Sequence, residues 1–388
     1  MSPRLPGDIA RFLTRIPAIP AVHTRVQGLR TLHEQLQALL GRSSHSNVLS
    51  IIRYVAYLVL LVNAGSLPFV WHIRVFWPLL ASRIEYGLRS RFIFIPKAKR
   101  ARAVIAWAEG QSPVGTTPFE AVTVYRTWAS PDDSDMFGMH LSNSSYAKAL
   151  DSTCLRALMK TLPTWNRSGG QCPLAATHYH FIREIPPLAT YEVRSSIASW
   201  DNKWIYLIAR FVTRPKRRNV IDAPRSQDST TPLTPDGVAH QNGTADVEKA
   251  VAAIVSGPRA PIMEPDGAIL HCVAVSLLCF KYGRITIPPA VVLGAEGYTK
   301  PPCPDSCISS YSHANPPPNW VKSQAIRVAP TGNMPNFQAF LKSGWRDVPE
   351  SERWWEKALG GPVEEKRRAN LDILESLKSG LDHARSIY

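Results

Sequence analysis

The amino-acid sequence predicts an α+β fold in which one long helix packs against an antiparallel sheet. Residues 144–162 carry apolar side chains on one helical stripe, and the segments on either side are rich in Val, Ile, Tyr and Trp, as strands are. Asp201 and Asn202 separate two such segments by a short turn, which predicts an antiparallel hairpin. Strands joined in this way around one long helix are typical of α+β domains.

The expected strands follow the chain in a simple order. One strand precedes the long helix and the others follow it. The last strand is apolar on both faces, so we expect it inside the sheet rather than at an edge. The predicted strands are 119–128, 177–185, 190–200, 203–212 and 269–282.

Changes in composition divide the rest of the chain. A polar stretch rich in Pro, Ser and Thr interrupts the domain after the fourth strand. Near the C-terminus, Pro362 suits the first turn of an amphipathic helix that would dock through its leucines. The predicted parts are a basic N-terminal segment (1–47), a membrane anchor (48–80), a domain (110–300) with an insertion at about 214–268, and an irregular loop with a C-terminal helical extension (301–388).

Composition limits the function classes. An apolar content of 45% in 388 residues is ample for a buried core, and a net charge of +15 favours anionic partners. No aromatic-interleaved basic motif accompanies the charge, so we expect no nucleic-acid partner. The six cysteines are predicted to be free thiols in a reducing compartment. Cys303 and Cys307 lack a second Cys/His pair, so no metal site is expected.

Residues 54–71 form an almost uncharged run of about 18 residues, near the minimum for a single membrane span. Trp71 and Trp77 are typical interface anchors, and the heavier basic flank on the C-terminal side predicts a cytosolic domain. Asn63 and Pro68 interrupt the run, which leaves a buried core helix or an interfacial segment as the alternative.

The loop before the long helix concentrates chemically useful groups. It contains Asp133, Asp135, Gly138 and His140, and Asn143 follows at the start of the helix. A helix N-terminus presents unpaired N–H groups and a partial positive charge, which can polarise a carbonyl. A carboxylate held there can activate water or attack an acyl carbon. On spacing alone, the alternative is that Asn143 caps the helix and both acids are turn residues.

This loop resembles that of hotdog thioesterases of the 4-hydroxybenzoyl-CoA thioesterase type, which read Asp-x-Asp-x-x-Gly before a helix start containing Asn and Tyr. Residues 67–76, 191–212, 280–289 and 344–355 are similar to fungal thioesterase-like proteins, some from secondary-metabolite gene clusters, and to animal relatives with an N-terminal anchor. The resemblance implies a hotdog fold, a homodimer, and hydrolysis of an acyl thioester. No cofactor is implied, because coenzyme A or pantetheine would enter as part of the substrate.

The resemblance also implies site roles. Asp135 would be the catalytic base or nucleophile, amides near Gly138 and the helix start would bind the thioester carbonyl, and His140 and Asn143 would orient substrate or water. The chain departs from the family pattern by one additional residue between Gly138 and Tyr146, and by Ser142 in place of a frequent Asn. The residues expected at the substrate are Tyr146 and, for the phosphates of coenzyme A, Arg214, Lys216, Arg217 and Arg218, whose alternative is a solvated or lipid-facing patch.

Two other functions use the same residues. Asp135 and His140 stand five apart, the spacing of the Asp/His pair in hotdog enoyl hydratases and dehydratases. A non-catalytic acyl-binding protein is the second alternative, because a fold does not by itself imply an activity.

Overall fold

The computed structural model describes residues 47–91, 96–215, 261–303 and 309–383. The chain forms two compact units, Met1–Ala64 and Gly65–Tyr388. The basic segment 1–47 and the insertion at 214–268 lie mostly outside the described residues, and the predicted domain limits stay predictions.

The second unit is built on an antiparallel sheet with the strand order β1-β3-β4-β5-β2, and β6 pairs with β5. The apolar β5 lies between β4 and β2, as its composition predicted. The strands are β1 (Thr123–Trp128), β2 (Leu174–Phe181), β3 (Thr190–Trp200), β4 (Trp204–Thr213), β5 (Ile269–Tyr282) and β6 (Ile285–Ile287).

The hairpin between β3 and β4 is confirmed. Asp201 Oδ1 accepts the backbone N–H groups of Lys203 and Trp204 at 2.7 and 2.6 Å, which closes the turn. Two of the predicted strands, β1 and β2, differ from the observed ones by more than one residue. Strand β1 begins at Thr123 instead of residue 119, because a capping box between Thr117 and Glu120 holds Pro118–Glu120 in a 3₁₀ turn.

The other strand is β2, which begins at Leu174 instead of residue 177 and ends at Phe181 instead of residue 185. The N–H groups of Ile182 and Arg183 both bond to the carbonyl of His271, so the regular ladder stops there. Pro186 and Pro187 follow and cannot donate to a ladder.

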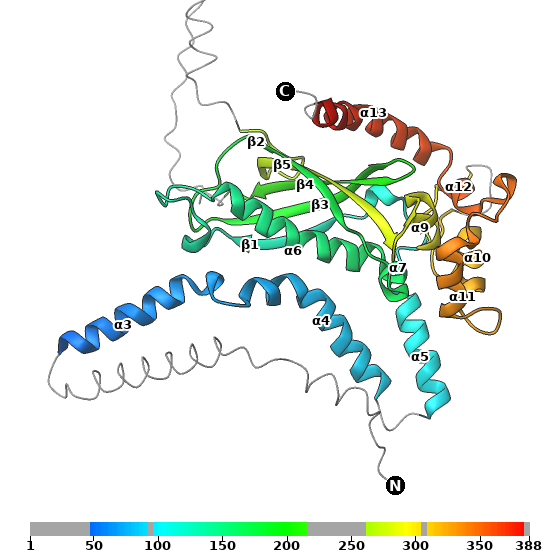
Figure 1. The fold of residues 1–388 in the computed structure, drawn as a ribbon, viewed down its shortest axis with the longest axis horizontal. Helices are drawn as coiled ribbons and strands as arrows, with labels where there is room; N and C mark the ends of the chain where they lie inside the picture. Colours follow the sequence, from blue (N-terminus) through cyan, green and yellow to red (C-terminus); the bar gives the residue numbers. More distant parts are fainter. Residues whose placement is uncertain (1–46, 92–95, 216–260, 304–308, 384–388) are drawn as a thin grey trace, which may run out of the picture. The chain divides into compact units, whose positions relative to one another are not determined.

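Helices cover both faces of the sheet (Figure 1). On one face lies α6 (Asn143–Thr161), whose Tyr146 and Leu150 share a core cluster with Phe211. On the other lies α13 (Pro362–His383), whose Leu374 packs in a cluster with Tyr206. Successive side chains of a strand point to opposite faces of the sheet, so alternate residues of each strand pack against the helix on each face. The predicted sheet around a long central helix, the hotdog-like arrangement, is confirmed.

A third cluster lies at the end of the sheet that carries the β3–β4 hairpin. It joins Trp165, Phe280, Trp354 and Trp355, so the tryptophan-rich segment 344–355 is partly core. Its helices are α7 (Pro163–Ser168), α9 (Pro289–Ala295), α10 (Pro318–Arg327), α11 (Met334–Ala339), a π-helical turn (Phe340–Gly344) and α12 (Trp354–Ala358).

Burial raises the pKa of the Cys154 thiol to about 12, as suits an unreactive cysteine.

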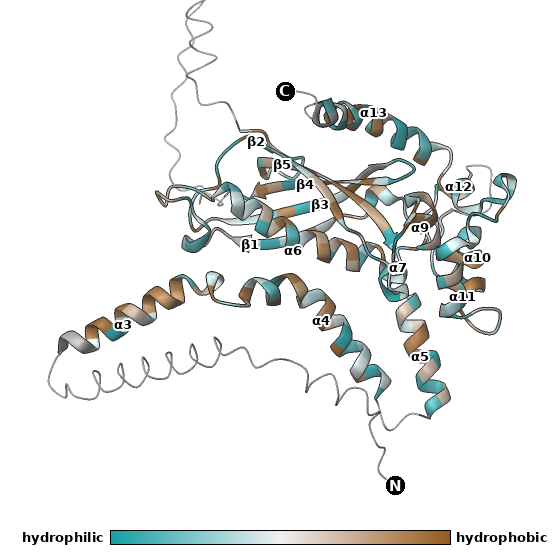
Figure 2. Ribbon diagram, in the orientation of Figure 1, coloured by the Kyte–Doolittle hydropathy of each residue, from teal (hydrophilic) through white to brown (hydrophobic). Residues whose placement is uncertain are grey.

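The apolar run 54–71 is divided in the structure. Helix α3 (Asn47–Val62) ends before Asn63, a 3₁₀ turn spans Ala64–Ser66, and α4 (Val70–Ser90) starts after Phe69, whose φ is +69°. Figure 2 shows mostly hydrophobic residues along α3. Among the helices of residues 47–91, 96–215, 261–303 and 309–383, none combines the length and apolar character needed to cross a bilayer. The membrane span therefore stays a prediction.

Candidate active site

The loop between β1 and α6 is closed by its own backbone. Ser134 bridges to Leu141 as in a short antiparallel pair. Inside that bridge, the N–H of Asp135 donates to the carbonyl of His140 at 2.9 Å, and the N–H of Gly138 donates to the carbonyl of Asp135 at 3.0 Å. Gly138 has φ +67°, a left-handed conformation that favours glycine. The loop is thus a compact turn at the N-terminus of α6.

The carboxylate of Asp135 lies inside this turn. Its oxygens accept the backbone N–H groups of Met139, His140 and Phe137 at 2.7, 3.2 and 3.2 Å. Desolvation acts to raise the pKa of Asp135, but these hydrogen bonds outweigh it and hold the pKa below its ordinary value. Asp135 is therefore ionised at neutral pH, as a carboxylate base or nucleophile must be.

Asp133 has a different role from Asp135. It is 5% exposed, and its carboxylate lies 2.6 Å from Lys148 Nζ of α6 and accepts the Ser130 hydroxyl at 2.9 Å. Its backbone carbonyl accepts the hydroxyl of Ser145, also on α6, at 2.8 Å. Asp133 therefore fastens the loop to the helix. Sequence reasoning missed Lys148, because only the fold brings together two residues 15 positions apart.

His140 contributes its backbone to Asp135 and its ring to other groups. Its Nδ1 is 3.0 Å from the carbonyl of Leu141, and its Nε2 is 3.8 Å from Glu184 Oε1. The bond to Leu141 is the largest cause raising the pKa of His140; desolvation opposes it, and Glu184 and Asp135 add to it. The Asp135 carboxylate accepts the backbone N–H of His140, while the imidazole ring contacts Leu141 and Glu184, and the hydratase alternative stays a prediction. Glu184 is a second neighbour that sequence reasoning missed.

The helix start differs in detail from expectation. Ser142 occupies the N-cap position and Asn143 is the first helical residue, exposed to solvent, so the reading of Asn143 as the cap is wrong. Tyr146 is 2% exposed, and its ring centroid lies 5.1 and 4.9 Å from those of Phe181 and Phe211. In the single chain Tyr146 belongs to the core. The predicted substrate roles of Tyr146 and Asn143 stay predictions.

An apolar tip surrounds Asp135, and no sequence signal had singled it out. Met136, Phe137 and Met139 are 91%, 75% and 67% exposed. Large apolar side chains clustered on a surface mark places where a ligand or another protein binds. The carboxylate is therefore framed by a surface suited to an apolar group.

The basic residues after β4 are only partly described. Arg214 Nε lies 3.2 Å from Glu192 Oε1, and Arg126 and Arg194 contact the same carboxylate. Lys216, Arg217 and Arg218 lie outside the described residues. Arg214 is 63% exposed, so it remains accessible to an anion, and its contact with coenzyme A stays a prediction.

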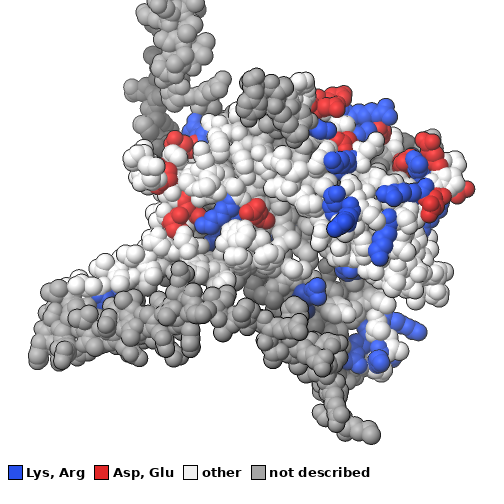
Figure 3. Space-filling view, viewed as in Figure 1, with Lys and Arg blue, Asp and Glu red and all other residues white. Residues whose placement is uncertain are grey.

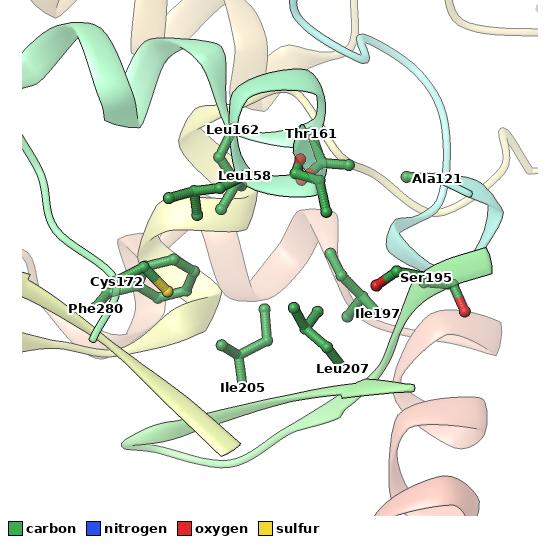
Figure 4. Close-up of a pocket in the computed structure, with 12 residues that line it drawn as sticks. Ala121, Leu158, Thr161, Leu162, Cys172, Ser195, Ile197, Ile205, Leu207 and Phe280 are labelled. Atoms are coloured by element: carbon green, nitrogen blue, oxygen red, sulfur yellow. The ribbon is translucent and has the colours of Figure 1, made fainter. Parts of the chain in front are cut away.

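A small cavity lies between the C-terminal half of α6 and the sheet, far from the acidic loop (Figure 4). Its volume is about 20 Å³, room for a water molecule, and its walls include Leu158, Ile197 and Phe280. Thr161, Cys172 and Ser195 also line it, and desolvation raises the pKa of the Cys172 thiol, which disfavours a reactive thiolate there. In the part of the chain that the structure describes, no group of three or more His, Cys, Asp or Glu residues is placed to hold a metal ion.

Comparison with known proteins agrees with this geometry. Residues 129–251 match the Thioesterase-like superfamily. Thioesterase lcsJ of Purpureocillium lilacinum is 28% identical over 184 residues, which are 41% of this chain and 59% of that protein. The protein named Probable thioesterase atnL of Emericella nidulans is 26% identical over 246 residues, 60% of this chain and 67% of its own length.

The chain thus spans less than two thirds of lcsJ. Among solved structures, the 4-hydroxybenzoyl CoA thioesterase from Pseudomonas sp. strain CBS-3 aligns with 45% of this chain and 97% of its own, at 13% identity and a TM-score of 0.28. The predicted resemblance to hotdog thioesterases is confirmed: residues 129–251 of this chain match the model of the Thioesterase-like superfamily.

Proposed function

We propose that this protein hydrolyses acyl thioesters and that Asp135 is the catalytic carboxylate. One observation carries the proposal: an ionised carboxylate is held by three backbone N–H groups at the N-terminus of α6. The exposed apolar tip around it supplies a surface for the acyl group. The match of residues 129–251 to thioesterase-like proteins supports the same reaction.

Two routes fit a carboxylate in this position. As a base, Asp135 takes a proton from water while the oxygen attacks the thioester carbon, and the thiolate leaves. As a nucleophile, Asp135 forms an acyl anhydride with loss of the thiolate, and water then hydrolyses the anhydride. In both routes the carbonyl oxygen gains negative charge, which the positive end of the α6 dipole would stabilise.

Replacing Asp135 by Asn tests the proposal. Release of free thiol from a panel of acyl-CoA substrates should fall by about 100-fold or more, since the charge that performs the attack is lost. Asp266→Asn is the matched control, because this carboxylate is exposed and pairs with Arg194 on the sheet. Equal rates for wild type and Asp135→Asn would refute the proposal.

Two other results would favour the alternatives. Hydration of an enoyl-CoA without thiol release would indicate a hydratase. Tight binding of acyl-CoA without turnover would indicate an acyl-binding protein. The acyl group, its carrier and a role in fungal secondary metabolism stay predictions.

We further propose that the active form is a homodimer. Strand β2 is the last strand of the sheet beside β5, and most of its residues are exposed or half-buried. An edge strand offers unpaired backbone groups to a second strand. Sedimentation should give twice the chain mass of 43.1 kDa; a mass of one chain at micromolar concentration would contradict the proposal.

The N-terminal helices support a proposal of membrane association, with the thioesterase domain on the cytosolic side. Helix α3 exposes apolar side chains along its length, among them Ile52 at 56% and Leu61 at 73%. Helix α5 (Lys97–Glu109) begins with the basic sequence KAKRAR, and Figure 3 shows Lys and Arg gathered there. Apolar and basic surfaces together suit an anionic lipid bilayer. In a flotation assay with anionic vesicles, the protein should therefore move with the vesicles. The double variant Leu58→Glu and Leu61→Glu should stay behind with the unbound protein.

A further inference from the structure

A second cavity, separate from the acidic loop, lies among four helices of the second unit. Its volume is about 410 Å³, within the range of small-molecule sites, and α4, α5, the end of α6 and α7 contribute to its walls. Met159 lines it, 16 positions after the start of α6 at Asn143. At 1.5 Å per residue the cavity is about 24 Å along the helix from the loop that holds Asp135.

One residue of the apolar wall of this cavity, Trp107, is held in place by polar neighbours. Leu79, Tyr86 and Trp107 line it together with Met159. The Trp107 indole N–H donates to Glu85 Oε1 at 3.0 Å, and the guanidinium of Arg89 lies over the Trp107 ring at 5.3 Å. A ring fixed in this way can contact a flexible apolar tail without first having to be ordered.

The charged residues of the cavity are of one sign. The described residues that line it include Arg83 and Arg167 and neither Asp nor Glu. Arg167 is 27% exposed and shares Glu109, outside the cavity lining, with Arg327. Arg83 makes no ion pair with any residue that the structure describes. The cavity therefore combines an apolar wall with the guanidinium of Arg83, which has no ion-pair partner within the described part of the chain.

We propose that this cavity binds a carboxylic acid with an aliphatic tail, as a second ligand site distinct from the thioester site. The carboxylate contacts Arg83, and the tail lies against Trp107 and Met159. Such an acid has the chemistry of a product of thioester hydrolysis, but binding at this site does not depend on that activity.

Two properties of binding follow. Each methylene added to the tail should tighten binding roughly fourfold until the cavity is filled, from about 0.8 kcal/mol per buried methylene. The negative charge of the carboxylate should strengthen binding through Arg83. Decanoate should therefore bind more tightly than 1-decanol, and the difference should depend on Arg83.

Calorimetric titration of the full chain with decanoate tests the site. Arg83→Gln should weaken decanoate binding about tenfold and leave 1-decanol binding unchanged. Arg102→Gln is the matched control, because Arg102 lies on α5 and does not line the cavity. The urea midpoint of Arg83→Gln should equal that of the wild type, which separates lost binding from lost folding.

Asp135→Asn distinguishes this proposal from the proposed function. Decanoate should bind this variant as tightly as the wild type whether or not thioester hydrolysis is lost. Equal decanoate affinity in wild type and Arg83→Gln would overturn the proposal. So would weaker binding to Asp135→Asn, since the acid would then occupy the thioester site, or equal affinity for decanoate and 1-decanol.

Discussion

The pair formed by Asp133 and Lys148 allows a stringent test of how the loop is held. Asp133 is buried, with its side chain 6% exposed, and Lys148 is 26% exposed, so neither partner is fully hydrated. Asp133→Asn removes the negative charge and leaves the ammonium of Lys148 partly buried without its partner. Removing one partner of a buried pair costs about 3–5 kcal/mol, and the partial exposure of Lys148 lowers this to about 2–4 kcal/mol.

The loss should be measurable as a lower free energy of unfolding in urea, followed by tryptophan fluorescence, and as a melting temperature lower by roughly 5 °C. Asp133→Asn combined with Lys148→Met removes both charges and should recover most of the lost stability. Asp266→Asn is the control, since Asp266 is exposed and an ion pair at the surface contributes little to stability. A single variant within about 0.5 kcal/mol of wild type, or a double variant no more stable than the single, would refute the reasoning.

Three further predictions use other parts of the fold. In Gly138→Ala the added methyl group would meet no atom within 4 Å, but the residue would have to keep φ +67°. The free energy of unfolding should therefore fall by about 1 kcal/mol, and thiol release should fall about tenfold or more because the loop is disturbed. Unchanged activity would show that the turn is not needed. Burial raises the pKa of Glu296 from 4.5 to about 7. Between pH 4.5 and about 7 the folded state therefore keeps a proton that the unfolded state has lost, so the free energy of unfolding falls as the pH rises. Glu296→Gln should remove this pH dependence from the free energy of unfolding measured by denaturation. Leu374→Ala removes a side chain that is 7% exposed between α13 and the sheet and should cost about 2–3 kcal/mol in urea unfolding, whereas a loss below about 0.5 kcal/mol would mean that α13 is not docked.

The two aspartates of the Asp-x-Asp motif have different roles, which matters when such motifs are interpreted. Both stand in one short sequence, yet Asp133 binds a lysine of α6 and Asp135 binds backbone N–H groups. The first arrangement fastens the loop, and the second presents an ionised carboxylate. Variants of the two positions should therefore separate stability from activity.

Much of the fold was predictable from the sequence, because periodicity and turn chemistry act locally. The apolar stripe of 144–162 predicted α6, which spans Asn143–Thr161, and β5 has the predicted limits of 269–282. The turn at Asp201 predicted the hairpin, since its side chain satisfies the N–H groups of the next residues. Pro362 is the first residue of α13, as its missing N–H suits.

The sequence pattern also placed the acidic loop at a helix N-terminus, and the resemblance to hotdog thioesterases singled out Asp135 within it. Tertiary structure was needed for the rest, because contacts between distant residues leave no periodic signal. Only folding brings Lys148 to Asp133 and Glu184 to His140. The division of 54–71 into two helices, and the cavity that Arg83 lines, likewise depend on how the backbone turns and on which helices meet.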